Sequence, residues 1–441
     1  MRYVGQMWRR TGSVVSIGAV VAVLALAVPG GGADARGAAG TDSRATSRMF
    51  TPTHGTSVGA RFFGLHAPLL GTLFPQAPAG SVDLTTNNVY WPQLETSPGV
   101  FDYSTLDPMV AQAAAHHAKP LLVLGVTPSF AAAQTAGLTQ AQIQASVPDM
   151  VQWQSYVRAV VTRYQDALEY QIWPEPDVKN NFSGTPQQMA DLVAAAAKII
   201  HSVAPGATVV APAMVLRLHS ERAFMKAFFG STVGGKPIGS YVDAVGVDPY
   251  PLLDGTPEDS IALVQHAQKV LAAEHVTAPL WNLEVNYFVP VGGVTTAAPP
   301  TDRISMSYVI RTYVLNAATN VKRVYWLGWL RYFNLGISMV GDDGVTPTAS
   351  GQAFSRVHDW LLGQHARGCA YDKVSGVYSC EFVRAGRSSW VYWTQLGSSH
   401  AKAPAGARHV QSMYGVTTST RHGDRIRVTN APVWVSHQRV S

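Results

Sequence analysis

Short apolar runs alternate with longer segments of helical periodicity between residues 60 and 363 of this 441-residue chain. The runs are rich in β-branched and aromatic residues and too short for helices, which is typical of strands. Eight such runs occur: Arg61–His66, Ser81–Tyr90, Pro120–Val126, Tyr170–Trp173, Ala207–Met214, Val242–Tyr250, Pro279–Asn286 and Val321–Trp329. We predict that each forms a β-strand.

The segments between the runs place apolar residues three or four positions apart, as amphipathic helices do. The clearest of them are Leu106–Ala118, Met150–Tyr164, Pro186–Val203, Ile261–Ala273, Ile304–Ala318 and Phe354–Leu362. Thr185 before Pro186 predicts a helix start with proline at the first helical position, and Ser104 three residues before Asp107 resembles a capping box. The connection after the first strand has the weakest helical pattern.

Mostly apolar strands that alternate with amphipathic helices predict a parallel sheet covered on its outside. Eight such units in about 300 residues fit a closed (β/α)8 TIM barrel better than an open doubly wound sheet. No G-x-G-x-x-G follows the first strand, and no G-x-x-x-x-G-K-[ST] occurs. The sequence therefore predicts an α/β barrel over residues 60–363 without a nucleotide-binding loop.

The pattern changes at about Gln364. Four strand-like runs separated by Gly, Ser and Asp follow, at Val377–Val383, Ser389–Leu396, Ala407–Val416 and Ile426–Val435. They predict a small antiparallel, β-sandwich-like domain over residues 364–441, and the segment Met49–Pro52 is a candidate extra strand. Because no long Pro/Thr/Ser linker precedes this domain, we expect it to pack on the barrel rather than act as an independent carbohydrate-binding module.

The amino-terminal region has the features of an export signal. Arginines precede an uncharged apolar run from Val14 to Val28, and small residues follow it at Ala33–Ala35. We predict a signal peptide at residues 1–35, a linker at 36–59, and a protein that is secreted or held in the cell envelope without stable membrane insertion after cleavage. An uncleaved anchor is the alternative, although the run is shorter than the roughly 20 residues of a membrane span.

The composition narrows the possible classes of protein further. The chain is 47% hydrophobic and 14% charged, which favours a large core over disorder. The net charge is +6, yet no run of five basic residues occurs, so nucleic acid is not a predicted partner. The only two cysteines, Cys369 and Cys380, lie close together, and in an exported protein such a pair predicts a disulfide across a hairpin.

The active site of a barrel lies at the carboxyl ends of its strands, and two glutamates stand there. Glu175 follows the fourth strand, and Glu284 lies near the end of the seventh. Both have aromatic and apolar neighbours, which raise the pKa of a carboxylic acid and can divide a pair into one protonated acid and one ionised nucleophile. Glycoside hydrolysis requires that division, and tryptophans such as Trp281 offer flat faces for sugar rings.

Three stretches carry a family resemblance. Trp173-Pro174-Glu175-Pro176-Asp177 resembles the W-N-E-P-N signature of the large clan of retaining (β/α)8 glycoside hydrolases that includes families 5, 10 and 39. Trp281–Asn286 is similar to the strand-seven nucleophile segment of that clan, clan A. Val89–Tyr103 is similar to a V-x-W-x-x-I-E-x-x-x-G-x-Y-D-W pattern of family 39-like members. These matches span residues 60–360.

The resemblance implies the roles of individual residues. Glu175 would be the general acid/base, Glu284 the nucleophile, and Tyr250 a hydrogen-bond donor to that nucleophile. The carbohydrate substrate would contact residues at the ends of several strands. These are His66, Asn87, Asn88, Trp91, Trp173, Tyr250, Asn286, Trp326 and Trp329.

Three positions depart from the clan pattern. Asp83 stands where many members have arginine, Pro174 replaces the asparagine that contacts the 2-hydroxyl of the sugar, and Asp248 stands where histidine is frequent. Proline donates no hydrogen bond, so Asn87, Asn180 or Asn286 would have to supply the contact. Otherwise the sugar is a furanoside, a 2-deoxy or a 2-modified one, or activity is lost.

The sequence thus predicts a glycosidase that acts on an extracellular polysaccharide or glycoconjugate by double displacement, with no cofactor or metal. A non-catalytic glycan-binding barrel and a transglycosylase on the same site are the alternatives that stay open. A metal-dependent barrel hydrolase is disfavoured, because no H-x-H ends the first strand and no H-E-x-x-H occurs.

Overall fold

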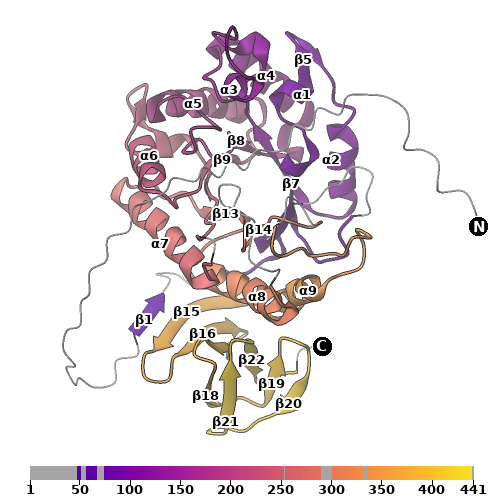
Figure 1. Cartoon of the computed structure of the whole chain (residues 1–441), viewed down its shortest axis with the longest axis vertical. Helices are drawn as coiled ribbons and strands as arrows, with labels where there is room; N and C mark the ends of the chain where they lie inside the picture. Colours follow the sequence, from indigo (N-terminus) through magenta and orange to yellow (C-terminus); the bar gives the residue numbers. More distant parts are fainter. Residues whose placement is uncertain are drawn as a thin grey trace, which may run out of the picture.

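The computed structural model describes residues 47–50, 56–66, 74–252, 254–289, 300–330 and 335–439. Eight parallel strands form a closed barrel in chain order, and the last strand pairs with the first. The strands are β3 (Phe63–His66), β4 (Ser81–Asp83), β7 (Lys119–Leu124), β8 (Glu169–Ile172), β9 (Val209–Met214), β12 (Ala244–Val247), β13 (Leu280–Val285) and β14 (Val324–Trp326). The predicted barrel is confirmed (Figure 1).

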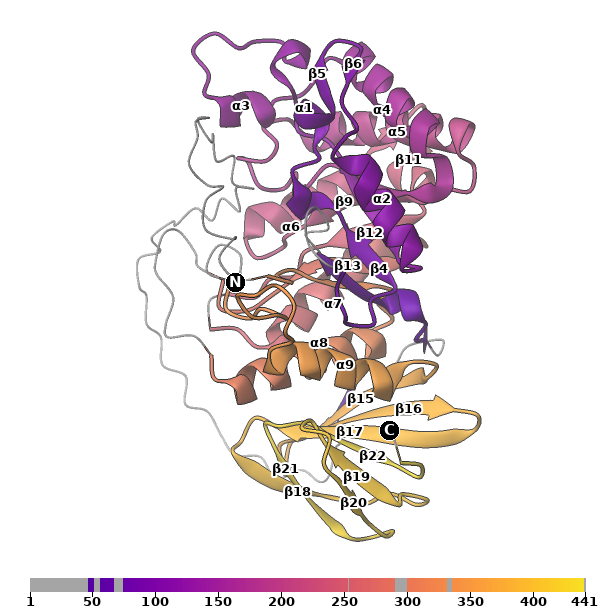
Figure 2. The same cartoon turned by 90° about the vertical axis from the view of Figure 1, so that its right-hand side faces the viewer.

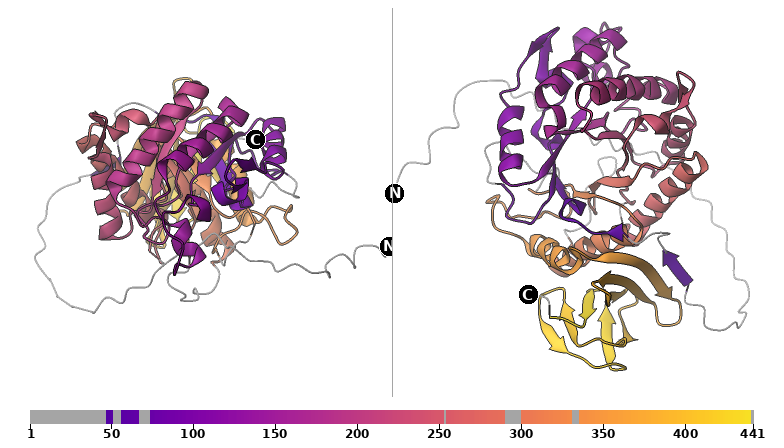
Figure 3. Two further views of the ribbon diagram at one scale, coloured as in Figure 1. Left: turned by 90° about the horizontal axis from the view of Figure 1, so that it is seen from above. Right: turned by 180° about the vertical axis from the view of Figure 1, so that it is seen from behind.

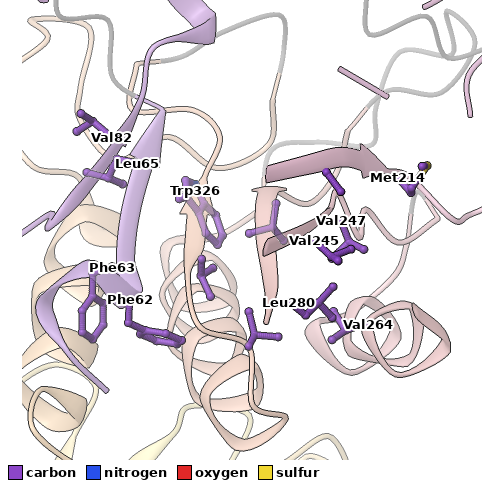
Figure 4. Close-up of a cluster of buried hydrophobic side chains, with 14 of the residues drawn as sticks. Phe62, Phe63, Leu65, Val82, Met214, Val245, Val247, Val264, Leu280 and Trp326 are labelled. Atoms are coloured by element: carbon purple, nitrogen blue, oxygen red, sulfur yellow. The ribbon is translucent and has the colours of Figure 1, made fainter. Parts of the chain in front are cut away.

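Helices surround the barrel on its outside (Figure 3). They are α2 (Leu106–Ala115), α4 (Met150–Tyr164), α5 (Pro186–Val203), α6 (His219–Phe229), α7 (Pro257–Ala273), α8 (Asp302–Ala318) and α9 (Ala349–Leu361). The predicted start of α5 is confirmed, since Thr185 accepts a hydrogen bond from the backbone N–H of Gln188 and Pro186 occupies the first turn. Apolar side chains such as Val245, Val264 and Trp326 fill the layer between strands and helices (Figure 4).

The inside of the barrel is filled at the amino ends of the strands. Arg323, just before β14, forms an ion pair with Glu169 on β8, and its guanidinium lies 4.0 Å from the ring centroid of Trp281. All three side chains are almost entirely buried, and paired charges tolerate such burial far better than single ones. The polar residues at the opposite, carboxyl ends are therefore the ones available for chemistry.

The chain changes from alternating to antiparallel structure between α9 and β15. The larger sheet has the order β1-β15-β16-β17-β22-β19-β20, with β2 also pairing with β15, and a second sheet pairs β18 with β21. The bounds are β1 (Ser47–Phe50), β2 (Thr56–Ser57), β15 (His365–Asp372), β16 (Val377–Arg384), β17 (Arg387–Thr394), β18 (Ser398–Lys402), β19 (His409–Ser412), β20 (Thr417–Ser419), β21 (Arg425–Thr429) and β22 (Val433–Ser436). The predicted β region, the extra amino-terminal strand and the Cys369–Cys380 disulfide are confirmed.

Helices α8 and α9 lie between the barrel and these sheets (Figure 2). Glu258, at the start of α7, accepts hydrogen bonds from Arg311 on α8 and from Trp393 and Gln395 at the end of β17. Trp360 on α9 donates a 2.6 Å hydrogen bond to Gln411 on β19. Polar contacts of this kind join the two parts of the chain, as expected from the short connection between them.

Several local predictions need correction. The run Ser81–Tyr90 is a strand only to Asp83; a 3-10 turn follows, then the short helix α1 (Trp91–Leu94) and the hairpin of β5 (Glu95–Ser97) and β6 (Val100–Phe101). The run 426–435 is divided between β21 and β22. The capping box at Ser104 is absent, because Asp107 instead accepts hydrogen bonds from Arg163 and Tyr164.

The predicted signal peptide at residues 1–35 lies outside the described residues, as does part of the predicted linker. Within the described ranges, no helix is long and apolar enough to span a membrane.

Candidate active site

Three carboxylates from different strands meet at the carboxyl end of the barrel. Glu175 follows β8, Asp248 follows β12, and Glu284 lies on β13. Each contributes an oxygen, and these oxygens all lie within 4.8 Å of one another. We call this group the acid cluster. The structure thus brings together the two glutamates predicted from sequence and adds Asp248, which the sequence marked only as a departure from the clan pattern.

Glu284 receives stabilising contacts for its ionised form. The hydroxyl group of Tyr250 donates a 2.8 Å hydrogen bond to its Oε2. Burial raises the pKa of Glu284, whereas His66 and the Tyr250 hydrogen bond lower it and Asp83 raises it. The predicted contact between Tyr250 and Glu284 is present, and it favours an ionised carboxylate.

The pKa of Glu284 is raised overall, and the pKa of Glu175 is raised as well. Burial, followed by the charges of Glu284 and Asp177, raises the pKa of Glu175 to about 8, while Arg217 lowers it. Its Oε2 accepts a 2.9 Å hydrogen bond from the side-chain amide of Asn181. At neutral pH this carboxyl group therefore holds a proton.

The backbone at the end of β8 is strained. Trp173 and Glu175 have φ angles of 67° and 41°, in the left-handed region that non-glycine residues seldom occupy. The indole N–H of Trp173 donates a 2.9 Å hydrogen bond to the carbonyl of Asn181, whose side chain binds Glu175. Trp173 is fully buried among Trp153 and Phe182, so it supports the Glu175 loop instead of offering a face to a sugar, contrary to the sequence prediction.

His66 lies at the end of β3 beside the acid cluster. Its Nε2 lies 2.7 Å from the carbonyl oxygen of Leu283, next to Glu284, and its Nδ1 lies 3.6 Å from Asp83. These two contacts fix the ring between β4 and β13. The ring therefore lies close to Glu284, and its predicted role in substrate binding stays a prediction.

Asn286, another residue predicted to contact the sugar, uses its side-chain amide in hydrogen bonds to the backbone of the barrel. The side-chain amide of Asn286 donates to the carbonyls of Leu327 and Ile337, at 2.6 and 2.8 Å, and its Oδ1 accepts from the N–H of Tyr287. Asn286 therefore ties the end of β13 to the segment after β14. A Cβ at Gly328 would lie 3.0 Å from this amide, so only glycine, at φ 102°, fits there.

The remaining predicted contacts are divided between core and surface. Trp91 is fully buried, stacks on Tyr156 and donates to Glu95, so it is a core residue and not a sugar platform. Trp326 and Trp329 are also buried, at 0% and 3% exposure. Asn87 donates to the carbonyl of Leu84, and Asn88 is exposed with φ 58°.

Sequence reasoning missed three residues near the acid cluster. Tyr90 is partly buried, and burial together with the charges of Glu284, Asp83, Glu175 and Asp248 raises its pKa well above the ordinary value. Asn181 binds Glu175, although the sequence pointed to its neighbour Asn180.

Arg217, the third missed residue, follows β9, and its guanidinium lies 5.9 Å from the ring centroid of Tyr250. Its position just after a barrel strand could have marked Arg217 as a candidate site residue from the sequence. Tyr90 is the last residue of the run Ser81–Tyr90 that was predicted as a strand, so position at a strand end could have indicated it as well.

Among the described residues, the acid cluster is also a place where three carboxylates could contact one cation. Ca²⁺ takes six to eight oxygen ligands and Mg²⁺ six. Three carboxylates supply part of such a set, and two of them are the glutamates that a glycosidase mechanism needs unoccupied.

Comparison with known proteins supports the fold. No protein-family model and no curated protein matches the chain. A family 39 glycoside hydrolase from Bacteroides cellulosilyticus is similar in structure, with a TM-score of 0.64 and 15% identity over 86% of this chain and 81% of that one.

Two further solved structures agree with it. A family 30 endoxylanase from Clostridium papyrosolvens has a TM-score of 0.60 and 12% identity over 87% of this chain and 98% of that one. A β-xylosidase from Caulobacter crescentus has a TM-score of 0.57 and 13% identity over 88% and 97%. The barrel with its carboxyl-terminal β region is thus a fold that solved glycoside hydrolases share.

Proposed function

We propose that the protein is a secreted retaining glycoside hydrolase that cleaves O-glycosidic bonds of an extracellular polysaccharide or glycoconjugate. Glu175 is the general acid/base, and Glu284 is the nucleophile. The observation that carries the proposal is the pair of carboxyl groups at one end of the barrel in unequal environments. The names of the similar solved structures, all glycoside hydrolases, support the same class.

The spacing of the two glutamates supports retention. Their nearest oxygens lie within 4.8 Å. Retaining enzymes hold the two carboxyl groups about 5–5.5 Å apart, whereas inverting enzymes leave about 6.5–9.5 Å for a water molecule. A distance of at most 4.8 Å between the nearest oxygens agrees with the shorter separation, in which Glu284 attacks the anomeric carbon directly while Glu175 reaches the leaving oxygen.

The different surroundings of Glu175 and Glu284 indicate which of the two carries the proton. A pKa of about 8 keeps Glu175 protonated at neutral pH, as an acid must be. Burial raises the pKa of Glu284 overall, but the nearby His66 and the Tyr250 hydrogen bond oppose that rise and favour the ionised form that a nucleophile requires.

In the first step, Glu284 forms a bond to the anomeric carbon, while the bond to the leaving oxygen breaks and that oxygen takes the proton of Glu175. In the second step, Glu175 removes a proton from water. The oxygen of that water attacks the anomeric carbon and releases Glu284, so atoms and charge balance over the cycle.

A panel of aryl pyranosides, aryl furanosides and cell-wall polysaccharides tests the proposal. The wild type should release product from at least one member, while Glu284→Gln should release none. Glu274→Gln, at the end of α7 and outside the site, is the matched control and should keep full activity. Silence across the panel with glycan binding intact would contradict hydrolysis and favour a non-catalytic barrel.

A further inference from the structure

Asp248 is an acid for which the two-carboxylate mechanism has no use. Its backbone is fixed at the end of β12, because its N–H donates to Met214 at 2.9 Å and its carbonyl accepts from Tyr250 at 2.8 Å. Its side chain is 2% exposed, and its Oδ1 has no hydrogen-bond partner within the part of the chain that the structure describes. A buried carboxyl oxygen without a partner is costly, so the position is explained best by a ligand that satisfies it.

The surroundings of Asp248 are acidic. Its oxygen lies within 4.8 Å of oxygens of both Glu175 and Glu284. Burial raises its pKa first, and the charges of Glu284, Glu175, Asp177 and Asp83 raise it further. With Glu175 protonated, Asp248 and Glu284 remain as two buried acids, and they ionise together more readily when a positive charge lies beside them.

The position of Asp248 identifies the part of a substrate that it would meet. In a retaining enzyme, the anomeric carbon lies between the acid and the nucleophile. A side chain close to both carboxyl groups is therefore within reach of the substituent on the adjacent carbon, C2. Glu284 is partly exposed, so solvent and substrate reach this group.

We propose that Asp248 binds the ammonium group of a 2-amino-2-deoxy sugar, so that the substrate is a glycoside with a free amine at C2. This inference rests on the proposed function and names its substrate class. The ammonium supplies up to three N–H donors, one of which satisfies the unpartnered Oδ1 of Asp248. It also provides the positive charge that lets Asp248 and Glu284 ionise together.

A neutral hydroxyl at C2 fits less well, because it satisfies Oδ1 but leaves the acidic charge unopposed. A divalent cation also fits less well. It would require more oxygen ligands than the cluster provides and would occupy the proton-donating oxygen of Glu175.

Paired substrates test the inference. 4-Nitrophenyl 2-amino-2-deoxyglucosides and galactosides, in both anomeric forms, are compared with the parent 2-hydroxy and the N-acetylated glycosides. The wild type should cleave an amino glycoside with kcat/KM about ten- to a hundredfold above the parent, as a charge-assisted hydrogen bond allows. Asp248→Asn should remove most of that preference, because kcat/KM should fall much more for the amino glycoside than for the parent glycoside.

Asp243→Asn is the matched control, because Asp243 precedes β12 at the opposite end of the same strand. Its carboxyl accepts from the N–H of Val209 and lies 3.0 Å from His201, and asparagine retains an acceptor there. It should keep the wild-type preference. Thermal unfolding of both variants verifies that each is folded.

The inference would be overturned if the wild type preferred the parent glycosides, or if Asp248→Asn lost activity equally on both substrates. It would also be overturned if millimolar CaCl₂ or MgCl₂ altered the activity of the wild type but not that of Asp248→Asn. If no glycoside is cleaved at all, the proposed function has failed, and binding decides the inference separately. Titration with glucosamine and galactosamine against glucose and galactose should show amine-dependent binding that Asp248→Asn weakens about tenfold or more. Equal binding by both proteins would contradict it.

Discussion

The hydroxyl group of Tyr250 lies 2.8 Å from Oε2 of Glu284 and connects the carboxyl ends of β12 and β13. Tyr250 is 2% exposed and stands between two prolines, so its ring has little freedom to leave this position. The hydrogen bond lowers the pKa of a carboxylate that burial otherwise raises.

Tyr250→Phe should therefore weaken Glu284 as the proposed nucleophile. A hydrogen bond to a charged group contributes about 1.5–3 kcal/mol, so we expect kcat/KM to fall about ten- to a hundredfold. The pKa of Glu284 should rise without this donor, and because Glu284 must be ionised, the acidic limb of the pH–rate profile should move to higher pH. A profile with an unmoved acidic limb would show that Tyr250 only packs.

The alkaline limb should report Glu175. Its pKa is raised to about 8, and it acts as an acid only when protonated, so kcat/KM should fall as the pH rises through about 8. Arg217 lowers this pKa and Asp177 raises it. Arg217→Gln should consequently move the limb to higher pH and Asp177→Asn to lower pH. Shifts in the same direction in both variants would contradict the assignment of the acid.

Glu258 should be important for stability rather than catalysis. It is largely buried together with its ion-pair partner Arg311, at 9% and 3% side-chain exposure. Glu258→Ala leaves that guanidinium buried and unpaired, which costs about 3–5 kcal/mol. Urea unfolding measures the loss. Asp107→Asn, which breaks the exposed Asp107–Arg163 pair, is the control and should cost no more than about 1 kcal/mol.

The disulfide should stabilise the β region. Cys369 and Cys380 are directly paired across β15 and β16, at a sequence separation of 11. Closing a loop of that length lowers the entropy of the unfolded chain, and this raises the free energy of unfolding by about 3 kcal/mol at 25 °C. The double variant Cys369→Ser/Cys380→Ser should unfold at a correspondingly lower urea concentration. An unchanged midpoint would mean that the two strands are held by packing alone.

The periodicity of the sequence predicted most of the fold, because strands and helices of a barrel carry distinct apolar patterns. Helices α4 and α5 begin and end where their patterns do. Prediction failed where tertiary contacts decide the backbone. The run Ser81–Tyr90 was predicted as one strand from its apolar Val82, Leu84 and Val89, yet the chain turns after Asp83 and becomes helical where Trp91 packs inward onto Tyr156.

Part of the candidate site was predictable because the active site of a barrel lies at the carboxyl ends of its strands. Position at a strand end identified Glu175 and Glu284, the resemblance to clan A added His66 and Tyr250, and the structure brings these four residues together. It could not show which way a side chain turns, so Asn286 and Trp173 were assigned to the substrate although both hold the scaffold. Asn181 and Tyr90 approach the acid cluster from loops, whose course no periodicity describes.

The most direct test of the central assignment is to trap the glycosyl-enzyme intermediate. The protein is incubated with an activated 2-deoxy-2-fluoro glycoside of the sugar that the activity panel identifies, digested, and analysed by mass spectrometry. The account predicts one labelled peptide, modified at Glu284, and no label in Glu284→Gln. A label on another residue, or a turnover product of inverted configuration, would contradict it.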